Sequence, residues 1–132
     1  MSQRLHLDTN AIIALGDPSH AFFRAVEKCL EEGGSVCTDA VAWHEYIRGP
    51  VQPAEAARAL LILENRVVEL TRRTAETAAI LFNATGRRRA STADCLIAAS
   101  CMAEDATLLT QNVEDFKPFA SHGLKIARFH PL

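Results

Sequence analysis

The stretch that decides the fold is LHLDTNAIIAL, residues 5–15. Its first three residues alternate between apolar and polar character, which favours a short strand, and its last five form an uninterrupted apolar run. Between them stands Asp8-Thr9-Asn10, a polar group suited to capping the start of a helix. A strand that runs directly into a helix is the unit from which sheets flanked by helices are built.

The same alternation of strands and helices continues along the chain. Further short strands are predicted at residues 35–37, 67–70 and 107–110, with an edge strand at 124–127. Helices are predicted at residues 21–30, 40–48, 53–65, 74–85 and 91–104, followed by a turn-rich segment at 111–119. Helices between nearly all strands indicate an α/β fold, so we expect one domain over residues 1–132 with a central parallel sheet of four to five strands flanked by helices.

Composition and charge exclude several classes of protein. Apolar residues make up 48% of the chain, charged residues 23%, and the formal net charge is −2, which excludes binding of nucleic acid by overall positive charge alone. The longest apolar run falls far short of the roughly 20 residues of a membrane span, and no secretory signal is visible. The four cysteines are Cys29, Cys37, Cys95 and Cys101. They lack the spacing of a zinc finger and lie among apolar neighbours, so we expect reduced, buried thiols and a cytoplasmic protein.

Carboxylates at four positions stand outside the core pattern. Asp8 follows the first strand, and Glu45 lies in the helix after the second strand. Asp94 opens the helix that leads to the fourth strand, and Asp115 follows that strand together with Asn112. Because the carboxyl ends of parallel strands lie at one edge of a sheet, these side chains can converge there.

Each acid also has an ordinary structural explanation when it is taken alone. Asp8 is suited to capping the following helix, and Ser91 with Asp94 has the spacing of a capping box. Glu45 fits a solvated surface glutamate, and Asp115 fits a turn or cap after the fourth strand. The set of acids, rather than any one of them, therefore indicates a site.

A cluster of carboxylates favours the binding of a divalent cation. Neighbouring carboxylates raise one another's pKa values by repulsion, and a cation removes that repulsion. Oxygen ligands without histidine or thiolate favour Mg²⁺ or Mn²⁺ over zinc, and the scattered histidines form no pair spaced for a metal. Such a site is suited to hydrolysis of phosphodiester bonds by a metal-activated water.

The ordered set of motifs resembles the PIN-domain nucleases. The similarity rests on LDTN (residues 7–10), Glu45, ADCLIAA (93–99) and TQNVEDF (110–116), and it extends over about residues 5–127. More narrowly, the chain length and the closing T-x-N-x-x-D-F segment resemble the VapC toxins of type II toxin–antitoxin modules. The resemblance implies a small PIN-like α/β domain that acts as a Mg²⁺-dependent endoribonuclease, the toxin of a VapBC-like pair.

The resemblance also implies roles for individual residues. Asp8, Glu45 and Asp94 match the central metal-binding and catalytic acids of the family. Asn10 matches a position that supports the site by hydrogen bonding, and Thr110 matches a site hydroxyl.

The fourth acidic position is open. Many members of the family carry an acid where this chain has Asn112, and another where it has Asp115. We expect Asp115 to complete the catalytic and metal-binding set, with Asn112 in a supporting role, since an amide oxygen can also ligate a cation. The sequence leaves open whether one or two ions bind.

A basic triplet, Arg87, Arg88 and Arg89, precedes the helix that carries Asp94. It fits a phosphate-binding rim for RNA, or a surface for the cognate antitoxin, while a solvated loop without a partner is the ordinary alternative. VapC-like toxins commonly dimerise, so the resemblance also implies a homodimer. The apolar helix at residues 53–65 offers a surface for an antitoxin helix or for a second copy.

Other functions remain as alternatives. The main one is a catalytically weak or inactive PIN-like module that acts through protein or RNA binding, and Asn112 is its best support. A receiver domain requires an aspartate after the third strand, where the chain reads VVEL (67–70). A phosphohydrolase with an aspartate nucleophile requires a second aspartate at position 10, where the chain has Asn10.

Overall fold

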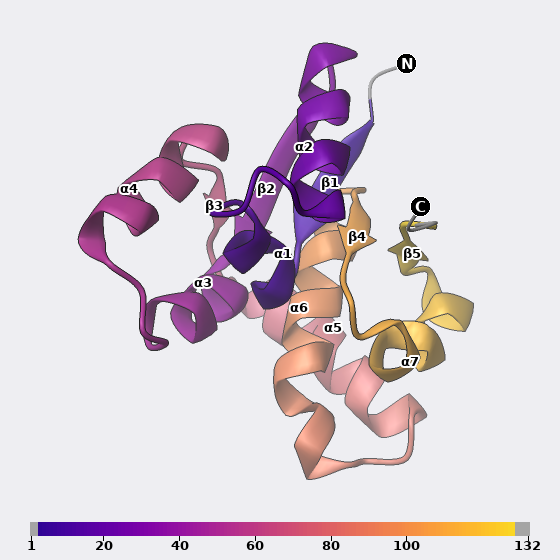
Figure 1. Ribbon diagram of the computed structural model, residues 1–132. Coiled ribbons are helices and arrows are strands. Elements are labelled where there is room, and N and C mark those ends of the chain that lie inside the picture. Colours follow the sequence, from indigo (N-terminus) through magenta and orange to yellow (C-terminus); the bar gives the residue numbers. More distant parts are fainter. Residues whose placement is uncertain (1–2, 129–132) are drawn as a thin grey trace.

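The strands form one parallel sheet in the order β3-β2-β1-β4-β5 (Figure 1). The computed structural model describes residues 3–128, so both ends of the predicted domain, residues 1–2 and 129–132, lie outside the described residues. The strands are Arg4–Leu7 (β1), Ser35–Asp39 (β2), Val67–Val68 (β3), Thr107–Leu109 (β4) and Lys125–Ile126 (β5). The α/β class and the parallel sheet flanked by helices are confirmed, and β5 lies at the sheet edge as predicted.

The helices follow the predicted pattern with shifts of a few residues at their ends. Their bounds are Thr9–Ala14 (α1), Ala21–Glu31 (α2), Ala40–Ile47 (α3), Pro53–Ile62 (α4), Arg72–Ala84 (α5), Thr92–Ala103 (α6) and Val113–Phe116 (α7). Two short 3₁₀ helices join them, Arg89–Ser91 (η1) and Lys117–His122 (η2). The segment predicted as turn-rich therefore holds α7 and the first half of η2, because Phe116 and Phe119 are buried and anchor both turns to the core.

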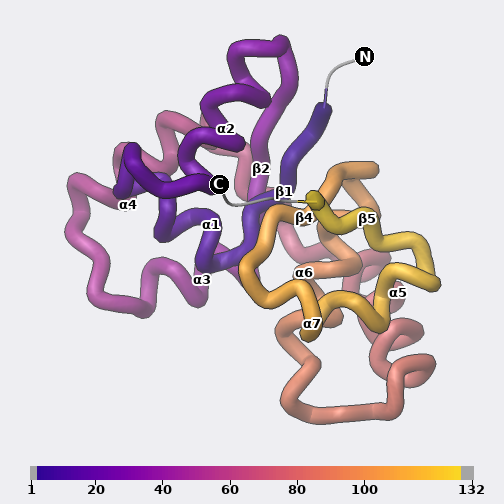
Figure 2. Tube along the Cα trace, turned by 45° about the vertical axis from the view of Figure 1, so that its right-hand side comes forward, coloured from indigo at the N-terminus to yellow at the C-terminus, as the bar shows by residue number. Residues whose placement is uncertain are grey.

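Helices α2 and α6 cover opposite faces of the sheet (Figures 1 and 2). On α2, Phe22, Val26 and Cys29 are buried at helical spacing, so one apolar stripe faces the sheet. Helix α6 is apolar on most sides and is sandwiched between the sheet and α5. Within residues 3–128, no helix is both long and apolar enough to cross a membrane.

The four cysteines are free and buried, which confirms the prediction of reduced thiols acting as small apolar groups. The core also contains polar side chains on β1 and β2. His6, Thr38 and Asp39 are buried there, where apolar side chains are the usual occupants. These polar groups lie next to the carboxyl ends of the strands, the edge at which the sequence predicts a site.

Candidate metal and active site

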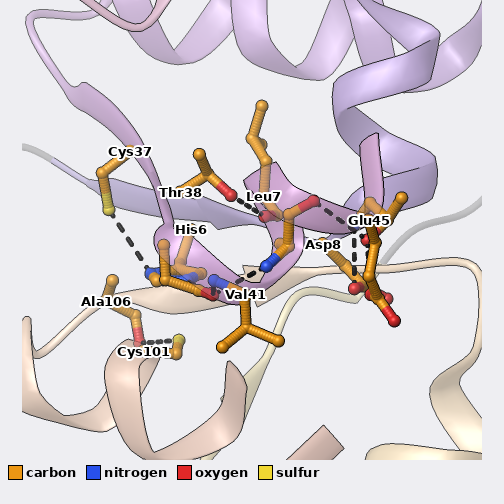
Figure 3. Close-up of polar contacts among 12 residues, drawn as sticks. His6, Leu7, Asp8, Cys37, Thr38, Val41, Glu45, Cys101 and Ala106 are labelled. Atoms are coloured by element: carbon orange, nitrogen blue, oxygen red, sulfur yellow. Dashed lines mark hydrogen bonds and ion pairs between the residues drawn. The ribbon is translucent and has the colours of Figure 1, made fainter. Parts of the chain in front are cut away.

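Asp8 directly follows β1 and caps α1 (Figure 3). Its carboxylate is 4% exposed, and Oδ1 accepts a hydrogen bond from the Thr9 backbone N–H at 2.8 Å. Oδ2 accepts from the Thr110 hydroxyl at 2.7 Å and from the Asn10 amide at 3.4 Å. The capping role and a place in a polar cluster therefore coexist, each using a different oxygen.

Glu45 lies next to Asp8, on α3 (Figure 3). The Thr9 hydroxyl donates to Glu45 Oε1 at 2.8 Å, so the side chain is held rather than freely solvated, and it is 26% exposed. This role of Thr9 was not predicted from the sequence. The motif contains a signal for it, since a hydroxyl directly after the aspartate that follows β1 can reach an acid on a neighbouring helix.

Asp94 and Asp115 reach the same edge from α6 and α7. The capping-box interpretation of Asp94 is wrong, because Ser91 donates its hydroxyl to the Arg88 carbonyl at 2.7 Å and makes no cap to α6. Within residues 3–128, neither carboxylate has a hydrogen-bond or ion-pair partner. Both are thus available to an external ligand.

The acids are close enough to affect one another's ionisation. Burial, followed by the negative charges of Asp8, Asp115 and Glu45, raises the pKa of Asp94 from 3.8 to about 6. Burial also raises the pKa of Asp8, although hydrogen bonds from Thr110 and Thr9 oppose the shift. The structure therefore brings all four predicted carboxylates together at one edge of the sheet.

One hydrogen bond ties the segment after β4 to the start of α1, and another orders that segment locally. Asn10 Oδ1 accepts from the Gln111 backbone N–H at 3.0 Å, and the Asn112 backbone N–H donates to the Thr110 hydroxyl at 3.0 Å. Asn112 precedes α7 but its side chain does not cap that helix. Asn10 and Thr110 thus donate hydrogen bonds to Asp8, while the Asn112 amide has no protein partner within residues 3–128.

The basic triplet does not contact the acids in the described part of the chain. Arg87 donates to the Asn83 side-chain oxygen and lies over the Phe82 ring, with its guanidinium carbon 5.7 Å from the ring centroid. Arg88 and Arg89 are exposed. Among the described arginines, Arg48 alone forms an ion pair with the cluster, at 3.8 Å from Glu45.

A buried ion pair joins β1 to β2 close to Asp8 in the chain, and it was not predicted as part of the site. His6 Nε2 is 2.6 Å from Asp39 Oδ2, and the two side chains are 0% and 1% exposed. Burial lowers the pKa of His6, but hydrogen bonds and charges from Asp39 and Cys37 outweigh it and raise that pKa to about 9. The imidazole is therefore cationic at neutral pH.

The donor set fits a hard divalent cation. All four carboxylates offer oxygen ligands, two of them have no partner within the described chain, and their repulsion is visible in the raised pKa of Asp94. As the side chains stand, no group of three or more His, Cys, Asp or Glu within residues 3–128 is arranged to hold a metal ion. The oxygen ligands of a metal site are thus present within residues 3–128, but they are not arranged around a single point as ligands of a bound ion are.

Comparisons with known proteins place the fold. No curated protein matches the sequence. Similar solved structures include VapBC2 from Rickettsia felis bound to a DNA fragment from their promoter, with 18% identity over 97% of this chain and 100% of that chain and a TM-score of 0.71. VapBC-1 from nontypeable Haemophilus influenzae matches with 21% identity, 95% and 97% coverage and a TM-score of 0.69. FitAcB from Neisseria gonorrhoeae matches with 16% identity, 94% and 96% coverage and a TM-score of 0.69.

These structural similarities show the fold, and the family follows from the sequence itself. The model of the PIN domain matches residues 5–120 and so includes every predicted acid. The recognised resemblance is confirmed: the chain belongs to the PIN-domain family.

Proposed function

We propose that this chain is a Mg²⁺-dependent endoribonuclease of the VapC type, the toxin of a type II toxin–antitoxin system. PIN domains are generally nucleases, and the observation that carries the proposal is the clustering of the four acids at the carboxyl edge of the sheet. Burial is the main cause of the raised pKa of Asp94, and the further increase from the charges of Asp8, Asp115 and Glu45 supports that clustering.

Asp8, Glu45, Asp94 and Asp115 would hold Mg²⁺, and Mn²⁺ has similar ligand preferences. When bound, the cation supplies Lewis acidity that polarises a phosphodiester and lowers the pKa of water. The protein contributes orientation: Thr9 and Thr110 donate hydrogen bonds that fix the carboxylates of Glu45 and Asp8, respectively. Fixed carboxylates need little reorganisation before they bind a cation and substrate.

The decisive experiment is cleavage of total RNA by the purified protein. Cleavage is expected with Mg²⁺ or Mn²⁺ and not with EDTA, and the products are expected to carry 5′-phosphate and 3′-hydroxyl ends. RNA that stays intact with both cations would contradict the proposed activity. Cleavage that persists in EDTA would contradict the role of the metal.

The toxin role has its own test and its own partners. The proposal includes a cytoplasmic location, a cognate antitoxin protein and a homodimer, and two of the similar solved structures are VapBC assemblies. Expression of this chain is expected to arrest bacterial growth, and co-expression of the small protein encoded beside it is expected to restore growth. If a variant that no longer cleaves RNA still arrested growth, that result would argue against a nuclease toxin.

A second function is supported by specific observations. Asn112 stands where many family members have an acid, and the described acids do not yet form a closed metal site. A catalytically weak or inactive PIN module that acts through protein or RNA binding would share both features. Tight RNA binding in Mg²⁺ without any cleavage would favour this alternative.

The exposed arginines before α6 give a prediction about RNA binding. Reversing both charges with Arg88→Glu and Arg89→Glu is expected to weaken binding and to flatten its salt dependence, by about 0.7 in the slope of log K against log salt for each lost phosphate contact. Fluorescence anisotropy with a labelled single strand, from low to moderate salt, measures both quantities.

Lys28→Glu is the matched control for this charge reversal. Lys28 is exposed on α2, and Figures 1 and 2 show α2 at the opposite end of the molecule from the α5–α6 connection. It is expected to leave the salt slope close to that of the wild type. Equal slopes for all three proteins would show that residues 87–89 are a solvated loop.

A further inference from the structure

The ion pair between His6 and Asp39 joins the two elements that carry Asp8 and Glu45. His6 lies on β1, two residues before Asp8, and Asp39 is the last residue of β2 and the N-cap of α3. Their side chains meet at 2.6 Å with almost no exposure to solvent. The Cys37 thiol contacts the second ring nitrogen of His6 at 3.5 Å, so the imidazole is held on both sides (Figure 3).

The other oxygen of Asp39 fixes the first turn of α3. Asp39 Oδ1 accepts hydrogen bonds from the backbone N–H groups of Val41 and Ala42, each at 2.9 Å. Glu45 follows Ala42 by three residues, so it lies close above that turn on the same helix. Because these hydrogen bonds hold the first turn of α3 in place, they also restrict the position of Glu45 on the next turn.

Thr9 holds the same turn from the other side. Its hydroxyl lies 2.8 Å from Glu45 Oε1 and 3.4 Å from the Ala42 carbonyl oxygen. Ala42 is therefore contacted through its N–H by Asp39 and through its carbonyl by Thr9. Both contacts lead back to the β1–α1 junction, where Asp8 lies.

Neither capping nor core packing requires an ion pair at this place. Serine, threonine or asparagine caps a helix as well as aspartate, and apolar side chains often replace a buried ion pair without loss of stability. A buried pair of this kind can instead select one arrangement of the elements it joins. The arrangement selected here is the one in which Asp8 and Glu45 share an edge.

We propose that His6 and Asp39 are a positioning pair, which fixes α3 on the end of β1 so that Glu45 and Asp8 serve the same cation. The inference rests on the proposed function, because the cation belongs to it. Partners that orient metal ligands from outside typically change metal affinity by about 10–100-fold when they are replaced.

The test is the double variant H6L/D39S. Replacing His6 alone with leucine would leave a buried, unpaired carboxylate, whereas the double change removes both charges and retains a hydroxyl cap for α3. Mn²⁺ affinity is measured from the EPR signal of the free ion, and stability from urea unfolding. We expect Mn²⁺ to bind at least about 10-fold more weakly than in the wild type.

Leu81→Ala is the control for a loss of core packing alone. Leu81 is buried on α5, which carries none of the four acids, so this variant is expected to lose stability while it keeps wild-type Mn²⁺ affinity. His6→Gln is the conservative variant, since its amide can donate to Asp39 where Nε2 does, and it is expected to retain Mn²⁺ affinity. An H6L/D39S protein with wild-type affinity would overturn the proposal, and so would a His6→Gln protein that is folded but binds Mn²⁺ as weakly as a variant without the pair.

A crystal structure of H6L/D39S without metal tests the positioning separately from the proposed function. We expect the contact between the Thr9 hydroxyl and Glu45, 2.8 Å in the wild type, to be lost. If wild-type protein failed to bind Mn²⁺, the proposed function would fail, and this structure would still decide the positioning role. An unchanged contact would overturn the proposal. If the double variant does not fold, the structure of Asp39→Asn is determined instead, because asparagine still caps α3 but removes the charge of the pair.

Discussion

Asp8→Asn is expected to reduce RNA cleavage by at least ~1,000-fold, since several kcal/mol of transition-state stabilisation depend on the cation that Asp8 would hold. Asp8 is the most buried of the four acids and is bonded by both Thr9 and Thr110. An amide in its place offers one neutral oxygen to the cation instead of a charged carboxylate. Initial rates on a defined RNA in Mg²⁺ measure the loss.

The same replacement is expected to leave the fold intact. The amide oxygen can still accept the Thr9 N–H and cap α1. Removal of a charge whose pKa is raised by burial offsets any loss at the Thr110 contact, so the free energy of unfolding is expected to stay within about 1 kcal/mol of the wild type. Circular dichroism and urea unfolding check this.

Asp17→Asn is the control, because Asp17 is an exposed aspartate in the turn before α2 and its side chain accepts hydrogen bonds from Ser19, away from the acids. It is expected to cleave RNA at the wild-type rate. Full activity in a folded Asp8→Asn protein would remove Asp8 from the site. Carboxyl NMR adds a readout without RNA: loss of the Asp8 charge is expected to lower the pKa of Asp94 below its wild-type value of about 6.

The positions of the four acids could be predicted because they depend on where the strands end. Apolar segments next to polar residues mark where β1 and β4 stop, and helices between the strands imply that the strands run parallel. These two facts place Asp8 and Asp115 at one edge without knowledge of any distance. Asp94 and Glu45 join them because the helices that carry them begin beside the same edge.

Contacts across the sheet could not be predicted in the same way. The Thr9–Glu45 and His6–Asp39 contacts join residues more than 30 positions apart, and they depend on the register in which Leu5 faces Val36 and His6 faces Cys37. A short apolar–polar–apolar strand does not fix that register by itself.

A local spacing was also misleading at the start of α6. Ser91 and Asp94 have capping-box spacing, yet η1 turns the serine hydroxyl back to the Arg88 carbonyl. The chain reaches α6 through this extra turn, and the sequence rule assumes a direct entry into the helix. The Asp94 carboxylate therefore takes no part in a capping box and lies among the other acids.

Asp94→Asn is expected to abolish Mg²⁺-dependent cleavage and, in the absence of metal, to stabilise the protein at neutral pH. The pKa of Asp94 is about 6 in the folded protein, against about 4 in an unfolded chain. Between these values the folded state holds the proton more tightly, so ionisation of Asp94 lowers stability as the pH rises through this window. Because the side chain is half-buried and lies in the first turn of α6, screening and the helix dipole reduce the expected gain to about 1 kcal/mol.

Urea unfolding at several pH values separates this electrostatic effect from a change in packing. In EDTA, wild type and Asp94→Asn are expected to be equally stable near pH 4, where the carboxyl is protonated, and to diverge up to pH 7. Glu27→Gln, an exposed change on α2, is expected to show no such divergence. A constant difference at every pH would mean that packing, and not charge, separates the variants.

Mg²⁺ should reverse the order of stability. A ligand that binds only the folded state stabilises it in proportion to the logarithm of its concentration over its Kd, so the wild type is expected to gain stability in Mg²⁺ while Asp94→Asn gains little. Protons compete with the cation for the same carboxylate, and the gain should therefore fade as the pH drops through about 6, the pKa of Asp94. Equal stabilisation of both proteins by Mg²⁺ would show that the cation does not bind at Asp94. Relief of the repulsion between Asp94 and the other acids would then not contribute to Mg²⁺ binding.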